Sequence, residues 1–291
     1  MTNKIFEGGA MPGVGPIHIS EIEPTLKALE KTLGIDLLNN TLGSVGKKQF
    51  SGDIDVALQI EPDAIPEFMD KLKNVPEIID MAKSSVIMTK VKIVGYDANK
   101  ESPDPNKPRT GFVQVDFMPG DPGFMKVFYH APSETESKYK GVFRNIMLSA
   151  IAAYYQRQDS EEKTDDGRPM RSERYIWSPT NGLVRIVRTP VPKKTGDGFT
   201  KKNNDEIISD PIKTAPEIAR ELGLDGPEDL NSYESLKASI EKNYKPELVQ
   251  KILTSFADNG VVKDIGVPDD LKTESLADKH LNRIKTLIHR I

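Results

Sequence analysis

The sequence predicts an α+β protein in which a mixed or antiparallel sheet flanked by helices is followed by a small, all-helical C-terminal region. Three observations predict this class. An apolar stripe at helical spacing lies near the N-terminus, alternating β-branched segments follow in the middle, and everything after about residue 205 has helical periodicity. We expect two domains, 1–204 and 205–291, separated within the charged, glycine-containing stretch 193–210.

The composition is that of a globular chain with a substantial core. It has 291 residues, of which 37% are hydrophobic and 29% charged. It contains no cysteine, which excludes disulfides and thiolate metal sites and suits a reducing compartment. The first twenty residues hold no apolar run of signal-peptide length, and no segment approaches the ~20 apolar residues of a membrane helix. We therefore expect a cytoplasmic protein without a membrane partner.

The N-terminal part of the chain predicts a helix, a strand and a second helix. Apolar residues at helical spacing predict the first helix over 19–33, with Ser20 and Glu23 as its capping box. Residues 54–60 predict a strand, and 64–82 predict a helix that is interrupted by a proline.

Two alternating β-branched segments, 86–96 and 111–118, predict the strands of a long hairpin. The Pro- and Asn-rich stretch between them is expected to be a loop. A strong apolar stripe then predicts a helix over 141–156.

A second hairpin is expected over 175–177 and 183–187, because an Asn-Gly pair between these segments is typical of a tight turn. The polar stretch 159–171 in front of it is expected to be a loop. The helices expected in the C-terminal region are 215–222, 232–240, 246–257 and 276–291.

Asp53 and Asp55 lie on either side of Ile54 in a run that is otherwise typical of a buried strand. Burying an unpaired carboxylate costs several kcal/mol, so these residues require a positive partner or an exposed strand end. Because strand side chains alternate, the two carboxylates share one face, about 7 Å apart at the backbone. Carboxylates so placed can bind one divalent cation or a close pair of cations.

A Gly-Ser pair and two lysines precede these aspartates. Gly43 allows the backbone to approach a ligand closely, and Ser44 offers a hydroxyl, so both suit a phosphate group. Lys47 and Lys48 add positive charge for the same ligand.

A third carboxylate stands alone in the strand-like run 112–118. A metal pair that catalyses phosphoryl transfer usually needs such a carboxylate from a neighbouring strand. Asp116 supplies it. Taken alone, Asp116 could also cap a turn at a strand end, but the three aspartates together favour a metal site.

A Gly-Ser pair, a short basic loop, the run Ser51-Gly52-Asp53-Ile54-Asp55 and a later strand aspartate resemble the DNA polymerase β nucleotidyltransferase superfamily, its family X polymerases above all. The resemblance covers about residues 20–155 and implies a polymerase β-like, palm-like core. It implies two Mg²⁺ ions, or Mn²⁺ in their place, held by Asp53 and Asp55, with Asp116 as the third ligand beside the attacking hydroxyl. The triphosphate-binding residues that it implies are Gly43, Ser44, Gly52 and one of the lysines Lys47 and Lys48, of which we favour Lys47.

Further positions are matched more loosely by the same resemblance. Tyr129 follows a phenylalanine where such polymerases place an aromatic pair beside the sugar, so it either stacks on the nucleotide or packs in the core. Lys140 and Arg144 on the next helix face either the same cleft or solvent.

The chain departs from family X polymerases at both ends. About twenty residues precede the first expected helix, so the family's DNA-gripping module is not expected, and the helical tail has no counterpart there. Small cores with this motif are similar to phage-borne nucleotidyltransferases, which would act in the host cytoplasm.

Basic residues are concentrated in one segment of a chain whose net charge is −4. Residues 138–202 contain fourteen lysines and arginines and seven acidic residues, which is a surplus of seven positive charges. Such a surplus predicts a basic face for nucleic acid, with an ordinary solvated surface as the alternative. The residues expected to bind an acceptor strand are Lys140, Arg144, Arg171, Arg174, Arg185 and Arg188.

Together these features predict a Mg²⁺-dependent nucleotidyltransferase. It would transfer a nucleoside monophosphate from a nucleoside triphosphate such as ATP to an acceptor hydroxyl, at the 3′-end of DNA or RNA, and release pyrophosphate. The alternatives are adenylylation of a protein or small molecule, and a non-catalytic nucleotide or nucleic-acid binding module. The four histidines are scattered without ligand spacing, so no zinc site is expected.

Overall fold

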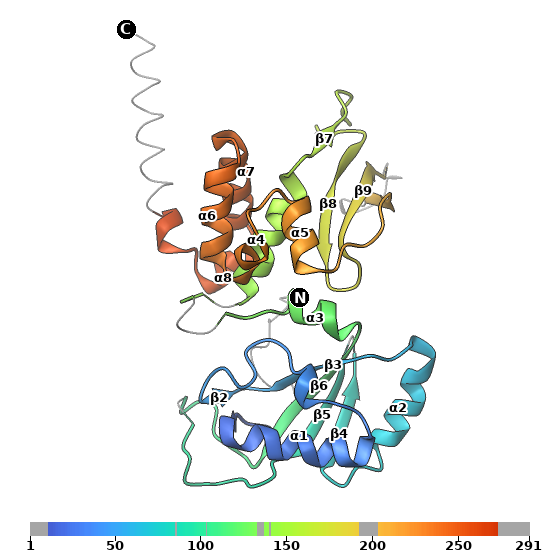
Figure 1. The fold of residues 1–291 in the computed structure, drawn as a ribbon, viewed down its shortest axis with the longest axis vertical. Coiled ribbons are helices and arrows are strands. Elements are labelled where there is room, and N and C mark those ends of the chain that lie inside the picture. Colours follow the sequence, from blue (N-terminus) through green and yellow to red (C-terminus); the bar gives the residue numbers. More distant parts are fainter. Residues whose placement is uncertain are drawn as a thin grey trace. The chain divides into compact units, whose positions relative to one another are not determined.

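The chain divides into two compact units, Met1–Gly141 and Val142–Ile291, each of which is considered by itself. The structure is a computed structural model, and it describes residues 11–84, 86–102, 104–132, 137–139, 141–191 and 203–272. Helices flank a mixed sheet in the first unit and an antiparallel sheet in the second (Figure 1). The predicted α+β class is therefore confirmed.

The first unit is built on a four-stranded sheet of order β3-β6-β5-β4. β3 runs parallel to β6, whereas β5 is antiparallel to both of its neighbours. The expected hairpin is thus present as β5 and β6. The elements of this unit are β1 (Ile17–His18), α1 (Ile19–Leu33), β2 (Phe50–Ser51), β3 (Ile54–Leu58), α2 (Ile65–Leu72), β4 (Ile78–Lys83), β5 (Ile87–Lys92), β6 (Phe112–Pro119) and α3 (Pro122–Phe128).

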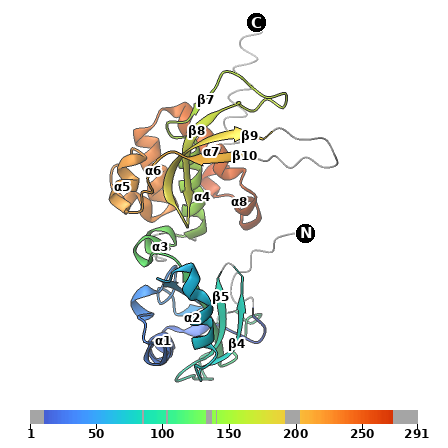
Figure 2. The same cartoon turned by 90° about the vertical axis from the view of Figure 1, so that its right-hand side faces the viewer.

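One face of this sheet forms the core of the first unit. α1 contributes its apolar stripe and α2 contributes Phe68 and Leu72 to a single buried cluster. The strands contribute every second residue, among them Val56 of β3 and Val115 and Phe117 of β6. Figure 2 shows α1 and α2 on the same side of β4 and β5. The opposite face of the sheet therefore carries the other set of strand side chains.

Two local predictions in this unit are wrong. α1 has the expected bounds, but its N-cap is His18, and Glu21 completes the capping box in place of Ser20 and Glu23. The helix expected over 64–82 ends at Leu72, and Ile78–Lys83 is the edge strand β4. A proline follows this helix closely, and pairing with β5 then outweighs helical propensity.

The second unit is built on an antiparallel sheet of order β10-β9-β8-β7. The second expected hairpin is present as β8 and β9. The elements of this unit are α4 (Gly141–Tyr154), β7 (Gln158–Asp159), β8 (Ser172–Ser178), β9 (Gly182–Pro190), β10 (Asn203–Ile207), α5 (Ala215–Glu221), α6 (Tyr233–Asn243), α7 (Pro246–Ala257) and α8 (Gly260–Ile265).

The division of the chain differs from the boundary at 204/205 expected from the sequence. β10 pairs with β9, and the backbones of Leu183 and Ile212 exchange two hydrogen bonds of 3.0 Å. Residues 203–212 therefore belong to the sheet and do not link two domains. The expected helices near 215, 232 and 246 are present as α5, α6 and α7, and the one expected over 276–291 lies outside the described residues.

Helices cover one face of the second sheet. The indole Nε1 of Trp177 donates to Asn145 of α4 at 3.4 Å, and the hydroxyl of Tyr175 donates to Glu221 of α5. Tyr175 and Trp177 alternate along β8, so they mark its helix-covered face. None of the helices in the described ranges is long and apolar enough to cross a bilayer.

Candidate active site

The three predicted aspartates gather on the face of the first sheet that α1 and α2 leave uncovered. Asp55 of β3 and Asp116 of β6 are direct neighbours in the parallel register. Asp53 lies in the bend just before β3, and its charge acts on both Asp55 and Asp116, so it lies close to them. Ile54, between the two aspartates, is fully buried in the core, whereas all three aspartates are partly exposed.

The carboxylates interact strongly with one another. Burial, with smaller contributions from the carboxylates of Asp53 and Asp116, raises the pKa of Asp55 to about 7. Burial also raises the pKa of Asp116 to about 6, with a contribution from Asp53 and against the opposing effect of hydrogen bonds from Gln114. Three half-buried carboxylates that oppose one another's ionisation form a site at which a cation would be stabilising.

Gln114 holds Asp116 in place. Its amide nitrogen donates to both carboxylate oxygens of Asp116, at 2.9 and 3.0 Å. Its amide oxygen accepts a hydrogen bond from the backbone of Met11 at 3.0 Å, and the side chain is 3% exposed. Sequence reasoning missed this residue, although a lone amide two residues before Asp116 in an apolar strand is a detectable signal.

The donor chemistry of this face suits magnesium or manganese. All three side chains are carboxylates, which are the ligands that these hard cations prefer. Among the described residues, however, no three His, Cys, Asp or Glu side chains are close enough together to form a group that could hold a metal ion. The residues therefore fit a divalent cation in chemical type, and binding would require their side chains to turn from the conformations described.

The predicted phosphate loop lies beside Asp55. The amide of Leu42 donates to the backbone oxygen of Asp55 at 2.9 Å, which ties the loop to β3. Gly43 then turns with a φ of 64°, and a Cβ at this position would lie 3.8 Å from Asp55 Oδ2. Ser44, the next residue along the chain, is exposed, and so is Gly52. The predicted Gly-Ser pair and the aspartates are thus neighbours in space.

Both lysines of the loop are exposed. Lys47 donates its ammonium group to the backbone carbonyl of Ala131, which joins the loop to the chain after α3. The preference for Lys47 over Lys48 as a phosphate ligand stays a prediction.

Tyr129 packs against apolar residues close to the aspartates. It packs against a small apolar cluster that contains Leu42, Ala57 and Met125. Burial raises the pKa of its phenol above the ordinary value, and the Asp55 carboxylate adds to this effect, so the ring lies near the aspartates. Whether it stacks on a nucleotide stays a prediction.

One residue predicted to bind an acceptor strand is placed elsewhere. Arg144 is 1% exposed, donates to the backbone oxygen of Leu230 and to Asn145 at 3.1 Å, and burial lowers its pKa to about 10. Arg144 therefore lies in the core of the second unit, on the buried side of α4. We remove it from the set of residues predicted to bind an acceptor strand. Lys140 lies outside the described residues.

The four arginines of the β8–β9 region do not form one surface. The register pairs Ser172 with Arg188, so Arg174 and Arg188 lie on one face of the hairpin. Arg185 lies on the other face, 2.7 Å from Glu173, and Arg171 is exposed just before β8. Arg174 and Arg188 are therefore brought together on one face, whereas Arg171 and Arg185 both lie beside Glu173.

No protein-family model matches this chain, and no curated protein matches it. The likeness to nucleotidyltransferases accordingly depends on the motif residues themselves.

Proposed function

We propose that this chain is a divalent-metal-dependent nucleotidyltransferase with a polymerase β-like core in its first unit. The observation that carries the proposal is the register of Asp55 opposite Asp116, with Asp53 on the same uncovered face and the Gly43-Ser44 turn beside them. An inert structural role would leave unexplained why three mutually repelling carboxylates are held together at this place.

Asp53, Asp55 and Asp116 would hold the metal. When bound, Mg²⁺ or Mn²⁺ neutralises these carboxylates and the charge of the phosphates and acts as a Lewis acid. The apolar strand residues behind the aspartates fix the backbone from which all three side chains project. Gln114 adds a second constraint, because it orients the carboxylate of Asp116.

The reaction replaces a phosphoanhydride bond of the triphosphate with a phosphate ester bond to the acceptor. The acceptor oxygen forms a bond to the α-phosphorus of the triphosphate, and the bond from this phosphorus to the bridging oxygen breaks, so that pyrophosphate leaves. The acceptor hydroxyl loses its proton to a nearby base. Asp116 is our candidate for this base, because Gln114 orients its carboxylate and a carboxylate beside a cation is ionised and able to accept a proton.

The chain's other contribution is to position the triphosphate. The Gly43-Ser44 turn offers backbone close to Asp55 and an exposed hydroxyl. Lys47 would exchange its present carbonyl partner at Ala131 for a phosphate oxygen. The surplus of seven positive charges between residues 138 and 202 supports a nucleic-acid end as the acceptor.

The test is an assay with each α-labelled nucleoside triphosphate, Mg²⁺, and DNA, RNA or tRNA as the acceptor. We expect label on one of these acceptors with release of pyrophosphate. Asp53→Asn and Asp55→Asn should abolish transfer, whereas Asp80→Asn, an exposed aspartate on β4 of the same sheet, should not. Label on protein would support adenylylation instead, and nucleotide binding without any transfer would overturn the proposal.

A further inference from the structure

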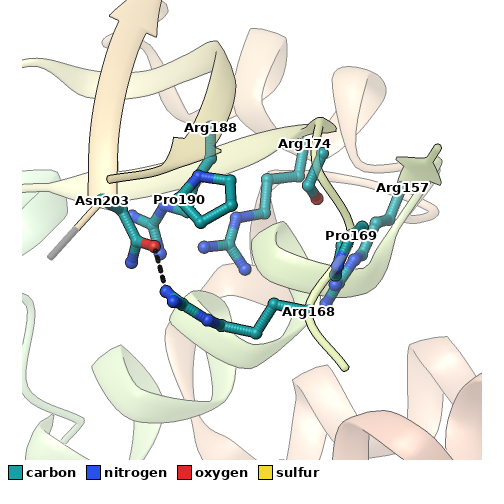
Figure 3. Close-up of a pocket in the computed structure, with 8 residues that line it drawn as sticks. Arg157, Arg168, Pro169, Arg174, Arg188, Pro190 and Asn203 are labelled. Carbon is teal, nitrogen blue, oxygen red and sulfur yellow. Dashed lines mark hydrogen bonds between the residues drawn. The ribbon is translucent and has the colours of Figure 1, made fainter. Parts of the chain in front are cut away.

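The second unit contains a hollow whose charged lining residues are all arginines. It has a volume of about 150 Å³ and is lined by Arg157, Arg168, Pro169, Ser172, Arg174, Arg188, Pro190 and Asn203. The arginines come from the segment after α4, the turn before β8, β8 and β9. Figure 3 shows the guanidinium groups of Arg168, Arg174 and Arg188 directed toward the same space.

Three of these arginines are paired with aspartates that do not line the hollow. Arg157 lies 2.8 Å from Asp159, and Arg168 lies 2.8 Å from Asp166. Arg188 donates two hydrogen bonds, of 2.6 and 2.5 Å, to the carboxylate of Asp205 on β10. Each guanidinium has five N–H donors, and these pairs engage only part of them. Donors therefore remain for a ligand.

Arg174 is the source of the surplus charge. Within the described ranges it forms no ion pair with a carboxylate, and its buried Nε has no hydrogen-bond partner. A buried donor without a partner destabilises a fold by about 1–3 kcal/mol, more for a charged group. A bound anion would satisfy this donor, whereas the lining residues offer no carboxylate that could.

The dimensions and the geometry favour a small, multiply charged anion. The hollow has room for more than a single water but lies below the roughly 300–1,000 Å³ of pockets that enclose a whole organic ligand. Guanidinium groups converge on it from separate segments. This suits a phosphomonoester, with three free oxygens and a charge of about −1.5 to −2 at pH 7, better than an internal phosphodiester, which carries one charge.

We infer that this hollow binds a phosphomonoester, and that its source is the terminal phosphate of a nucleic-acid strand. The choice of source rests on the proposed function, because a nucleotidyltransferase that acts on strand ends meets such phosphates. The shared chemistry, a phosphoryl group held by Arg168, Arg174 and Arg188, does not depend on that function. A free phosphate or small phosphate ester is the other source of the same chemistry.

The test measures binding without nucleoside triphosphate and in the presence of a chelator, so that it does not depend on transfer. Fluorescence anisotropy compares single strands of one sequence that end in a 5′-phosphate, a 3′-phosphate or hydroxyls only. We expect one phosphorylated end to bind at least tenfold more tightly than the hydroxyl form. Arg174→Gln should remove this preference, and Arg174→Lys should restore part of it, since lysine keeps the charge without the planar fork.

Two further variants make the result specific. Arg168→Gln, in the exposed turn before β8, should reduce the preference even if Arg174→Gln did not fold. Arg220→Gln removes one exposed arginine of α5 in the same unit and should leave the preference intact. Arg174→Gln should not lower the melting temperature without phosphate, whereas loss of a purely structural arginine would lower it.

Calorimetry with inorganic phosphate distinguishes the two sources. Phosphate binding that Arg174→Gln abolishes, without a preference among the strands, would support the pocket and assign it to free phosphate. If the unaltered protein neither prefers a phosphorylated end nor binds inorganic phosphate at millimolar concentration, the inference is overturned. That result would leave the proposed transferase intact, because no arginine of the hollow belongs to the aspartate site.

Discussion

The amide nitrogen of Gln114 donates to both carboxylate oxygens of Asp116, at 2.9 and 3.0 Å, on the uncovered face of the first sheet. The same side chain accepts a hydrogen bond from Met11, so the segment before β1 is connected to the third aspartate through one residue. Groups that orient a metal ligand in this way typically contribute 10–100-fold to metal affinity or activity.

Gln114→Met tests this positioning role, because methionine keeps most of the volume and removes the amide. We expect the Mg²⁺ concentration at half-maximal transfer to rise by ~10-fold or more, and Mn²⁺ binding followed by electron paramagnetic resonance to weaken in parallel. Gln59→Met, an exposed glutamine after β3, is the matched control. Equal metal dependence in the two variants would mean that Gln114 only fills space.

Asp55→Asn should stabilise the protein when no divalent cation is present. The substitution removes one of three carboxylates whose charges oppose one another in a half-buried position. In chelator, we expect the melting temperature of Asp55→Asn to exceed that of the unaltered protein. The rise in melting temperature on adding Mg²⁺ should be smaller than in the unaltered protein, because a ligand is missing.

The control for this comparison is again Asp80→Asn, which removes an exposed charge from the edge strand of the same sheet. It should change neither the melting temperature in chelator nor the response to Mg²⁺. A lower melting temperature for Asp55→Asn in chelator would show that Asp55 is held by a stabilising partner instead of opposed by like charges.

Gly43 and Gly46 offer a matched pair for the phosphate loop. Both have a positive φ, 64° and 72°, so alanine at either position should cost about 1–2 kcal/mol of stability. Only at Gly43 would the new methyl group lie near a site residue, 3.8 Å from Asp55 Oδ2, since nothing lies within 4 Å at Gly46. In denaturant titrations, we expect Gly43→Ala and Gly46→Ala to lose similar amounts of stability. In steady-state kinetics, we expect only Gly43→Ala to lower the transfer rate.

A buried ion pair fixes the start of α1. Glu21, 2% exposed, accepts hydrogen bonds from the backbones of His18 and Asp97 and from the guanidinium of Arg109. Arg109 also donates to the backbone oxygens of Asp97 and Lys100, at 2.7 and 2.9 Å. Burial acts to raise the pKa of Glu21, but these hydrogen bonds outweigh it and hold the pKa below its ordinary value.

This pair should make the stability of the protein depend on pH in the acid range. Because the folded pKa of Glu21 is lowered, its contribution is present above about pH 4.5 and is lost as pH falls below it. Glu21→Gln should destabilise the protein by ~3–5 kcal/mol at pH 7 and flatten the acid limb. Glu23→Gln, which removes an exposed partner of Lys27 on the same helix, should change the stability little. Urea titrations at several pH values would check both expectations.

The aspartates could be predicted from the sequence because their signal is local. A charged residue such as Asp116 in an otherwise apolar strand is visible without knowing its neighbours, and alternation places Asp53 and Asp55 on one face. β4 could not be predicted in the same way. Ile78–Lys83 is a strand because it pairs with β5, and that partner lies outside any local window.

The number of arginines in a segment does not predict which of them share a surface. Their number predicted a basic face, but hairpin register decides that Arg174 and Arg188 share one face while Arg185 lies on the other. The sequence did not indicate that Arg144 is buried, because α4 is apolar on most sides and its pattern gives weak evidence for which side faces the core. Arg157 and Arg168 line the hollow because of how the segment between α4 and β8 folds, which the sequence pattern does not predict.

The central claim, that the three aspartates hold a cation for nucleotidyl transfer, is tested most directly by the rate of label transfer from an α-labelled nucleoside triphosphate at saturating Mg²⁺. The rate is compared between Asp55→Asn and Asp80→Asn, with circular dichroism to verify that both are folded. We predict that Asp55→Asn lowers the transfer rate by more than ~100-fold, which exceeds the effect typical of residues that only orient a metal ligand. The transfer rate of Asp80→Asn should stay within about twofold of the rate of the unaltered protein. Near-equal rates in the two variants would contradict the assignment of this face as the active site.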